Sequence, residues 1–250
     1  MEIVPSDSAL FRSSMEALKE FLPQVQMRIS AEGVRINGMD VSHVGFVDYF
    51  LSKTDCSVLT VPTACVIGVN SMLLSKTLSS VGAGDRVSLS VKQDKLVVSY
   101  KNDKMSKKAS YEISTLDISE DMVSLPDLQF EASVSAKTSD ILAIVKEVGG
   151  FGDTMKLRLD EDGFHVSAEG DGGMAKQTLE NTDDRDMTLG SDFMEASFGT
   201  KYLTTIMKSG APLSSSTRLE FDGSQPLRAT FLFGKESRFM AFLAPKIMDN

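Results

Sequence analysis

The sequence predicts an α+β protein of two similar halves, each built from antiparallel β-sheet with two helices on one side. Three observations predict this class. Short alternating segments are joined by polar turns, the same pattern recurs about half a chain later, and amphipathic segments precede the hairpins. A chain of 250 residues is long enough for two domains of ordinary size.

The first repeated element is a hairpin with an acidic turn closed by glycine. It occurs at residues 27–36 and again at residues 156–166, where Gly33 and Gly163 are 130 positions apart. Glycine supplies the positive φ that such a turn often needs. The pattern therefore predicts two equivalent hairpins, one in each half.

A second hairpin recurs at the same offset. Residues 87–100 form the first copy and residues 217–231 the second, with Leu89 and Leu219 again 130 positions apart. Two matches at one offset indicate a duplication. The strands are too many and too evenly spaced for alternating βαβ units, so antiparallel sheets are expected.

Four segments have the apolar spacing of amphipathic helices, two in each half. Each places one apolar stripe toward a sheet, as in Phe11, Met15, Leu18 and Leu22 of the first segment. The expected helices cover residues 8–22, 70–81, 138–148 and 200–209.

An acidic stretch with a proline and no clean period separates the halves. It reads as a linker. We therefore expect an N-terminal domain at residues 1–117, a connecting loop at 118–128 and a C-terminal domain at 129–250.

The composition limits the possible functions. Hydrophobic residues make up 42% and charged residues 24%, with no long apolar run and no signal-like start, so we expect an intracellular protein without a membrane segment. Cys56 and Cys65, with the scattered His43 and His165, are too few for a disulfide framework or a zinc site. We expect no metal and no cofactor.

An enzyme is the main rival class. The acidic stretches at 160–163 and 169–173 lack the regular spacing of a calcium loop and are expected to be hairpin turns. The glycines at 81–85 lack the Gly-Lys-Ser/Thr that completes a phosphate loop. No serine or cysteine has a histidine partner by motif, so no catalytic residue is expected.

The net charge of −9 argues against nucleic-acid binding by the surface as a whole. The helices are different, because each carries positive charge away from its apolar stripe. Lys201 and Lys208 lie about 20° apart around their helix, and Lys76 and Lys146 oppose the stripes of theirs. Solvated lysine is the default on any helix, yet positive faces on all four favour a wall that contacts phosphates without reading bases.

Short motifs in family order give the chain a resemblance to sliding clamps of the proliferating cell nuclear antigen family. GMDVSHV at 38–44 is similar to the family's MDSSHV segment, and LAPKI at 243–247 is identical to its C-terminal motif. EALK at 16–19, GVN at 68–70 with SK at 75–76, VSLP at 123–126 and APLSS at 211–215 lie in the same order. The resemblance covers nearly the whole chain.

The resemblance implies the DNA clamp fold. Three subunits would close into a ring, with the helices lining the hole and edge strands at residues 109–117 and 174–180 joining neighbours. Double-stranded DNA would be encircled without sequence preference. The side chains that would face it are Arg12, Lys19, Lys76, Lys146, Lys201 and Lys208.

The resemblance also implies a front-face groove for a DNA polymerase, a clamp loader and other proteins carrying a peptide with a glutamine and an aromatic pair. Its expected residues are Met39, His43, Val44, Phe46, Val123, Leu125, Pro126, Pro226, Ala244 and Pro245. The expected role is that of a processivity factor in DNA replication and repair, in the nucleus of a eukaryote or of a cell infected by a nuclear-replicating virus.

The chain departs from the family at three places. Phe46 stands where leucine is usual, TVPT at 60–63 replaces a segment with cysteine and arginine, and Glu161 occupies the position of the usual modified lysine. The alternative is a subunit of a heteromeric, checkpoint-type clamp. Intact basic helices and an intact C-terminal motif favour a homotrimer.

Overall fold

The computed structural model describes residues 1–82, 84–102, 104, 106–118, 128–183 and 185–246. The chain divides into two compact units. Unit 1 contains Met1–Val41, the described part of 47–123 and Phe233–Phe239, and unit 2 contains Ser42–Phe46, the described part of 124–232 and the described end of the chain from Met240. Each unit therefore includes a short segment from the other half of the sequence.

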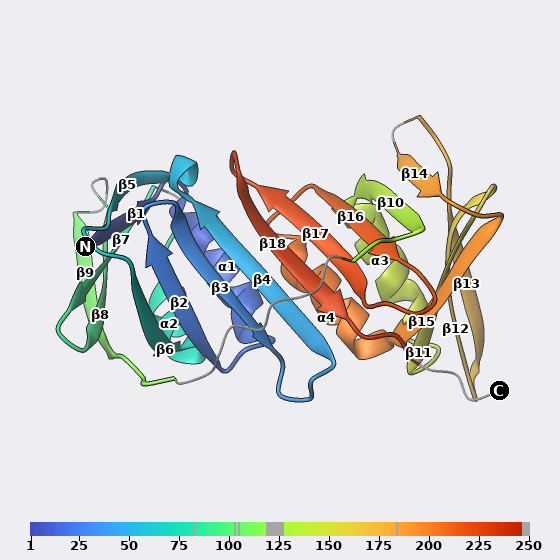
Figure 1. Cartoon of the computed structure of the whole chain (residues 1–250), viewed down its shortest axis with the longest axis horizontal. Coiled ribbons are helices and arrows are strands. Elements are labelled where there is room, and N and C mark those ends of the chain that lie inside the picture. The colour runs from blue at the N-terminus through green and yellow to red at the C-terminus, as the bar shows by residue number, and fades with distance from the viewer. Residues whose placement is uncertain (83, 103, 105, 119–127, 184, 247–250) are drawn as a thin grey trace. The chain divides into compact units, whose positions relative to one another are not determined.

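The elements of the first half follow the repeat predicted from the sequence (Figure 1). They are β1 (Glu2–Pro5), α1 (Ser8–Lys19), β2 (Gln24–Ser30), β3 (Gly33–Met39), β4 (Gly45–Ser52), the 3₁₀ turn Lys53–Asp55, β5 (Cys56–Thr60), β6 (Cys65–Asn70), α2 (Ser71–Leu78), β7 (Arg86–Lys92), β8 (Lys95–Asn102) and β9 (Lys107–Ser114).

The second half repeats the same order without the 3₁₀ turn. Its elements are β10 (Ala132–Lys137), α3 (Thr138–Val148), β11 (Thr154–Asp160), β12 (Gly163–Gly170), β13 (Gly173–Glu180), β14 (Asp186–Leu189), β15 (Phe193–Gly199), α4 (Thr200–Gly210), β16 (Ser216–Phe221), β17 (Leu227–Phe233) and β18 (Ser237–Leu243).

Strand pairing repeats as well. The first half has the sheet order β5-β1-β7-β8-β9, and the second half has β14-β10-β16-β17-β18. Ile3 pairs with Leu89 in the first sheet, and Val134 pairs with Leu219 at the equivalent place in the second. The duplication and the antiparallel sheets predicted from the sequence are confirmed.

The two recurring glycines close equivalent turns. Gly33 has φ 146° and Gly163 has φ 139°, a region that other residues rarely adopt. A Cβ on Gly33 would lie 2.1 Å from the carbonyl oxygen of Leu51 in β4, and one on Gly163 would lie 2.3 Å from that of Leu179 in β13. Glycine therefore recurs because both turns need this backbone angle and leave no space for a side chain.

Each unit has a helix pair packed on sheet. In unit 1, α1 packs against α2, and α2 contacts β2, β6 and β9. In unit 2, α3 packs against α4, with α3 over β10, β12, β13 and β16 and α4 against β15. Apolar side chains such as Leu18 and Leu74 in unit 1, and Ile141 and Leu203 in unit 2, are buried between helix and sheet. Burial of such side chains is the main stabilising term of each unit.

The ends of three predicted elements were wrong. The first helix ends at Lys19 and not at residue 22, since Pro23 follows Leu22 and disfavours helix before it. The second ends at Leu78, short of residue 81. The strand expected at 109–117 is β9, Lys107–Ser114, because the Thr115 N–H donates to the Asp94 carbonyl and the Leu116 N–H to that of Gly68, both at 2.8 Å.

The acidic stretches of the sequence are hairpin turns, as predicted. Asp160 pairs with Gly163 across the β11–β12 turn, and Gly170 pairs with Gly173 across the β12–β13 turn. Over the described residues, His, Cys, Asp and Glu form no group of three that could hold a metal ion. None of the described helices combines the length and apolar character needed to cross a bilayer.

Candidate nucleic-acid interface and partner groove

The helices of unit 1 begin at side-chain caps that fix their direction. The Leu10 N–H donates to the carboxylate of Asp7 at 2.9 Å, and the Leu73 N–H donates to the Asn70 side-chain oxygen at 2.8 Å. Each cap satisfies a backbone donor that the first helical turn leaves without a partner.

Lys76 lies on the solvent side of α2. Leu74 and Leu78 are buried in the core of unit 1, whereas Lys76 between them in sequence is exposed. No described carboxylate forms an ion pair with it. Its ammonium group is therefore available to an external anion.

The helices of unit 2 present three more lysines in the same way. Lys146 on α3 and Lys201 and Lys208 on α4 are exposed, while Ile144, Ile206 and Met207 face the core. None of the three lysines forms an ion pair within the described structure. Glu147 next to Lys146 instead accepts a hydrogen bond from the Gln177 amide at 3.1 Å.

Arg12 has a structural contact that the sequence did not indicate. Its Nη1 donates to the Val81 carbonyl at 2.6 Å, just beyond the end of α2, and its Nε is buried without a hydrogen-bond partner. Arg12 therefore links α1 to the end of α2. Lys19, half-buried in the last turn of α1, is less exposed than the lysines of the other helices.

The start of the expected partner groove lies in unit 2. The Ala244 N–H donates to the Val44 carbonyl at 2.9 Å, which places the segment around Val44 beside the C-terminal LAPKI motif. The side chains of Val44, Ala244 and Pro245 are half-buried. These residues form a partly exposed apolar surface of the kind that binds a peptide side chain.

Phe46 belongs mainly to the core. It is 5% exposed, and its ring lies 5.8 Å from that of Phe242, which is 7% exposed. The sequence did not reveal this, because a single apolar residue beside a short motif does not show whether it packs in the core or lines a groove. The structure therefore places Phe46 in the core of unit 2 and not on an exposed surface.

The other residues of the expected groove vary in position. His43 is exposed with φ 57°, Met39 at the end of β3 is half-buried, and Pro226 is half-buried in the turn before β17. Met39 belongs to unit 1, and His43 and Pro226 belong to unit 2. Val123, Leu125 and Pro126 lie outside the described residues.

His165 sits in a hydrogen-bonded cluster on β11–β13. Its Nε2 lies 2.8 Å from the Asp160 carboxylate and its Nδ1 lies 2.8 Å from the Thr178 hydroxyl, while Arg158 Nε donates to the other Asp160 oxygen. Burial alone raises the pKa of Asp160, but the bonds from Arg158 and His165 outweigh it and lower the pKa to about 2. The cluster stabilises the β11–β13 sheet.

Sequence reasoning missed two exposed apolar residues on α2. Met72 and Leu73 lie beside Lys76 on the solvent side and are 65% and 45% exposed. The helical period identified the buried stripe correctly but predicted a polar opposite face. Met72 and Leu73 are apolar residues on that exposed face. No local pattern in the sequence predicted their exposure.

Comparisons with known proteins agree on one family. Residues 1–122 match the profile of the proliferating cell nuclear antigen N-terminal domain, and residues 124–247 match that of its C-terminal domain. Proliferating cell nuclear antigen 2 of Drosophila melanogaster is 24% identical over 98% of this chain and 96% of its own length. Proliferating cell nuclear antigen of Chaetomium thermophilum is 22% identical over 97% and 96%.

A crystal structure shares the fold. Proliferating cellular nuclear antigen from Entamoeba histolytica superposes with a TM-score of 0.91 at 24% identity, covering 98% of both chains. The duplicated helix-on-sheet unit with basic helix faces is thus that of a DNA sliding clamp. The chain belongs to the proliferating cell nuclear antigen family, whose members act in DNA replication and repair as processivity factors and are not enzymes.

Proposed function

We propose that three copies of this chain close head to tail into a homotrimeric ring that encircles double-stranded DNA in the nucleus. The ring tethers a polymerase, a clamp loader and repair proteins. The observation that carries this proposal is the set of exposed lysines on α2, α3 and α4, each opposite a buried apolar stripe in a chain of net charge −9.

Two edge strands support the ring. β9 and β13 each have eight residues, and each ends its sheet in the described structure with one strand neighbour. Tyr111 on β9 is 38% exposed and Met174 on β13 is 61% exposed. Pairing β9 of one subunit with β13 of the next gives hydrogen-bond partners to the backbone groups of both edge strands and covers both side chains. When three subunits close into a ring, every β9 edge and every β13 edge is paired.

The lysines bind DNA weakly and without sequence preference. Each phosphate contact releases about one counterion, and none depends on base sequence, so the ring is held near the duplex axis and slides. Partner proteins bind through a peptide with a glutamine and an aromatic pair, at an apolar groove that includes Val44, Ala244 and Pro245. Met39, His43, Phe46, Val123, Leu125, Pro126 and Pro226 complete the proposed set.

The experiment measures processive synthesis on primed circular DNA over a series of salt concentrations. One variant replaces the helix lysines with alanine, at Lys76, Lys146, Lys201 and Lys208. A control variant replaces four exposed lysines outside the helices, at Lys53, Lys92, Lys104 and Lys235.

The helix variant is expected to lose processivity steeply with salt, whereas the control follows the unmodified protein. Equal salt curves for the two variants contradict the proposal. Light scattering on the same samples separates the alternatives for assembly: a homotrimer has three times the 27.2 kDa subunit mass, and a subunit of a heteromeric clamp expressed alone stays at one.

A further inference from the structure

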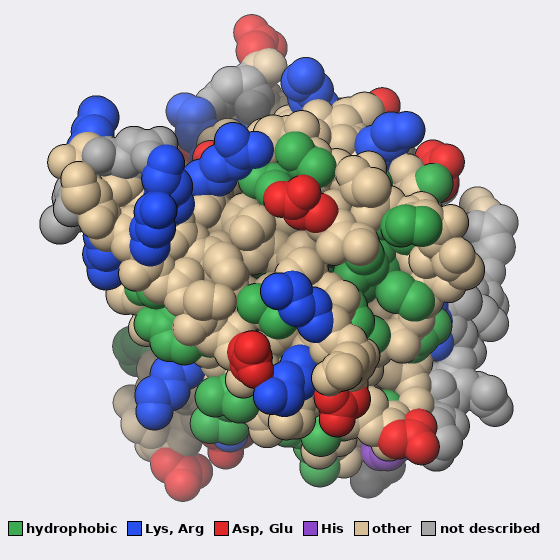
Figure 2. Space-filling model, turned by 90° about the vertical axis from the view of Figure 1, so that its left-hand side faces the viewer, with side chains coloured by type: hydrophobic (Ala, Val, Ile, Leu, Met, Phe, Trp, Pro, Cys, Tyr) green, Lys and Arg blue, Asp and Glu red, His purple; other side chains and the backbone are tan. Residues whose placement is uncertain are grey.

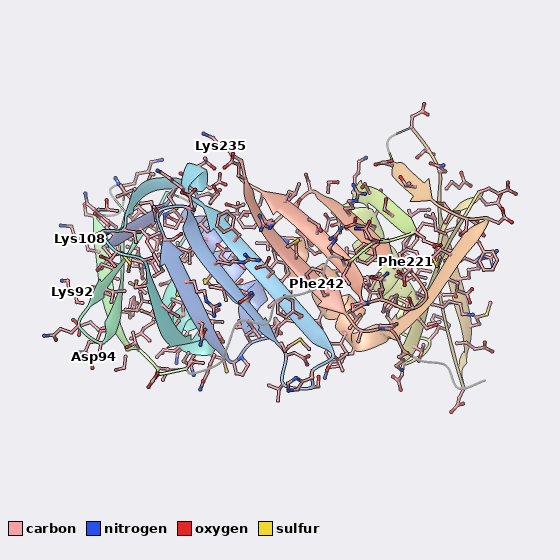
Figure 3. The ribbon with its side chains drawn as sticks, viewed as in Figure 1. Lys92, Asp94, Lys108, Phe221, Lys235 and Phe242 are labelled. Carbon is pink, nitrogen blue, oxygen red and sulfur yellow. The ribbon has the colours of Figure 1, made fainter. Side chains whose placement is uncertain are left out.

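The outer face of the β7-β8-β9 sheet carries three cations in one row. Arg86 pairs with Lys101 across β7 and β8, and Lys101 pairs with Lys108 across β8 and β9. Neighbouring strands lie about 4.8 Å apart, so the row spans about 10 Å. Figure 3 shows Lys108 projecting from this side of unit 1.

Sheet stability does not explain this row. Like charges directly opposite one another on adjacent strands are destabilising. Arg86 and Lys108 are exposed, and no carboxylate in the described part of the chain forms an ion pair with either. The arrangement is more favourable once an anion lies across it.

A row of hydroxyl groups lies next to the cations. Ser88, Ser99 and Ser110 pair across the same three strands, and the hydroxyls of Ser99 and Ser110 lie 3.0 Å apart. Both rows line one hollow of about 600 Å³. Glu2 and Val4 of β1, the strand on the other side of β7 from β8, also line it. Its charged lining residues give a net charge of +2. Figure 2 looks onto this side of unit 1 and shows Lys and Arg side chains gathered in the upper left of the view.

The hollow is separate from the helix lysines. The opposite face of the same strands carries Val87, Leu89 and Val98, which are buried in the core of unit 1. In the proposed ring the helices face DNA, so the Arg86–Lys101–Lys108 row faces outward.

We propose that this hollow binds a phosphorylated serine or threonine side chain of a partner protein. A phosphate monoester carries about −1.5 to −2 charges and three acceptor oxygens, which match the net charge of the lining and its hydroxyl and guanidinium donors. The carboxylate of an acidic peptide supplies half that charge in one group.

A nucleic-acid strand fits the hollow less well. Binding a strand requires cations that follow the backbone over several phosphates. Here the two rows next to the cations carry none: the serine row follows, and the row after it is Ser90, Val97 and Glu112. A single compact dianion is the better match.

The experiment captures short peptides on the immobilised full-length protein from a degenerate library with a central phosphoserine or phosphothreonine. The enriched sequence is then titrated in phosphorylated and unphosphorylated form by fluorescence anisotropy. The variants are Arg86→Ala with Lys108→Ala, the charge-preserving pair Arg86→Lys with Lys108→Arg, and the control Lys92→Ala. Lys92 lies on the same face three rows away.

The phosphorylated peptide is expected to bind at least about tenfold more tightly than the unphosphorylated one. The double alanine variant loses this preference, and the charge-preserving pair and Lys92→Ala keep it. Failure to enrich any phosphopeptide, equal binding of both forms, or tighter binding of a single-stranded oligonucleotide at the same residues overturns the proposal. Each variant is first checked for unchanged thermal unfolding. Because Lys108 lies on β9, the strand of the proposed subunit interface, each variant is also checked for unchanged mass by light scattering. None of the substitutions touches the helix lysines, so with an unchanged mass the result is independent of the clamp test.

Discussion

The Asp55 carboxylate fixes the turn that ends at Ser237. Its Oδ2 accepts hydrogen bonds from the Ser237 hydroxyl at 2.7 Å and from the Ser237 and Glu236 N–H groups at 3.0 Å, while Oδ1 accepts from the Lys235 N–H at 2.6 Å. Burial raises the pKa of Asp55, but these bonds outweigh it and lower the pKa below its usual value. Residues 182 positions apart are thereby joined within unit 1.

Replacing Asp55 with alanine is expected to destabilise unit 1 by about 2 kcal/mol, because several backbone donors lose a charged acceptor. Urea unfolding measures the change. Asp94→Ala is the matched control, since that exposed side chain makes no hydrogen bond in the described structure. Equal stability of the two variants contradicts the role of Asp55.

The Asp160 cluster predicts an acid-dependent stability. The pKa of Asp160 is about 2 in the folded chain against an ordinary 3.8, so its contribution is fully present above pH 3.8 and is lost as the pH falls toward 2. Solvent screens this partly exposed cluster, so the energetic effect is smaller than the full shift implies. Asp160→Asn should lower the free energy of unfolding by up to about 1 kcal/mol at pH 7 and by much less near pH 2. If the difference in unfolding free energy between Asp160→Asn and the unmodified protein does not change with pH, the charge of Asp160 does not contribute to stability and the prediction is contradicted.

Val44 and Phe46 are predicted to behave differently although they lie two positions apart. Val44→Asp should weaken binding of a glutamine/aromatic-pair peptide at least about tenfold while the oligomer persists, because a charge replaces an apolar contact. Phe46→Ala should instead cost about 3–5 kcal/mol of stability, because a buried ring is removed.

Peptide titration and thermal unfolding on both variants separate the two effects. Leu232→Asp, an exposed position on β17, is the control. Loss of peptide binding in the control, or none in Val44→Asp, contradicts the placement of the groove.

The sequence predicted structure correctly where the cause is local, such as the helical spacing of apolar residues or the backbone angle of a turn. Helix stripes such as Ile141 with Val145, and the turn glycines Gly33 and Gly163, have local causes and were predicted correctly. Strand register is not local, and this is why the alignment of Arg86, Lys101 and Lys108 in one row was not foreseen. Phe46 and Arg12 show the same limit, because a single residue at the start of a strand or on a helix flank carries no signal of what it packs against.

We propose that the protein holds DNA by encircling it. To test encirclement, the clamp is loaded onto nicked circular DNA with a eukaryotic clamp loader and ATP, and its retention is compared before and after a restriction enzyme linearises the circle. A closed ring stays on the circle at a salt concentration that disrupts phosphate contacts and leaves over the free ends of the linear form. Equal retention on both forms, or release from both, contradicts encirclement.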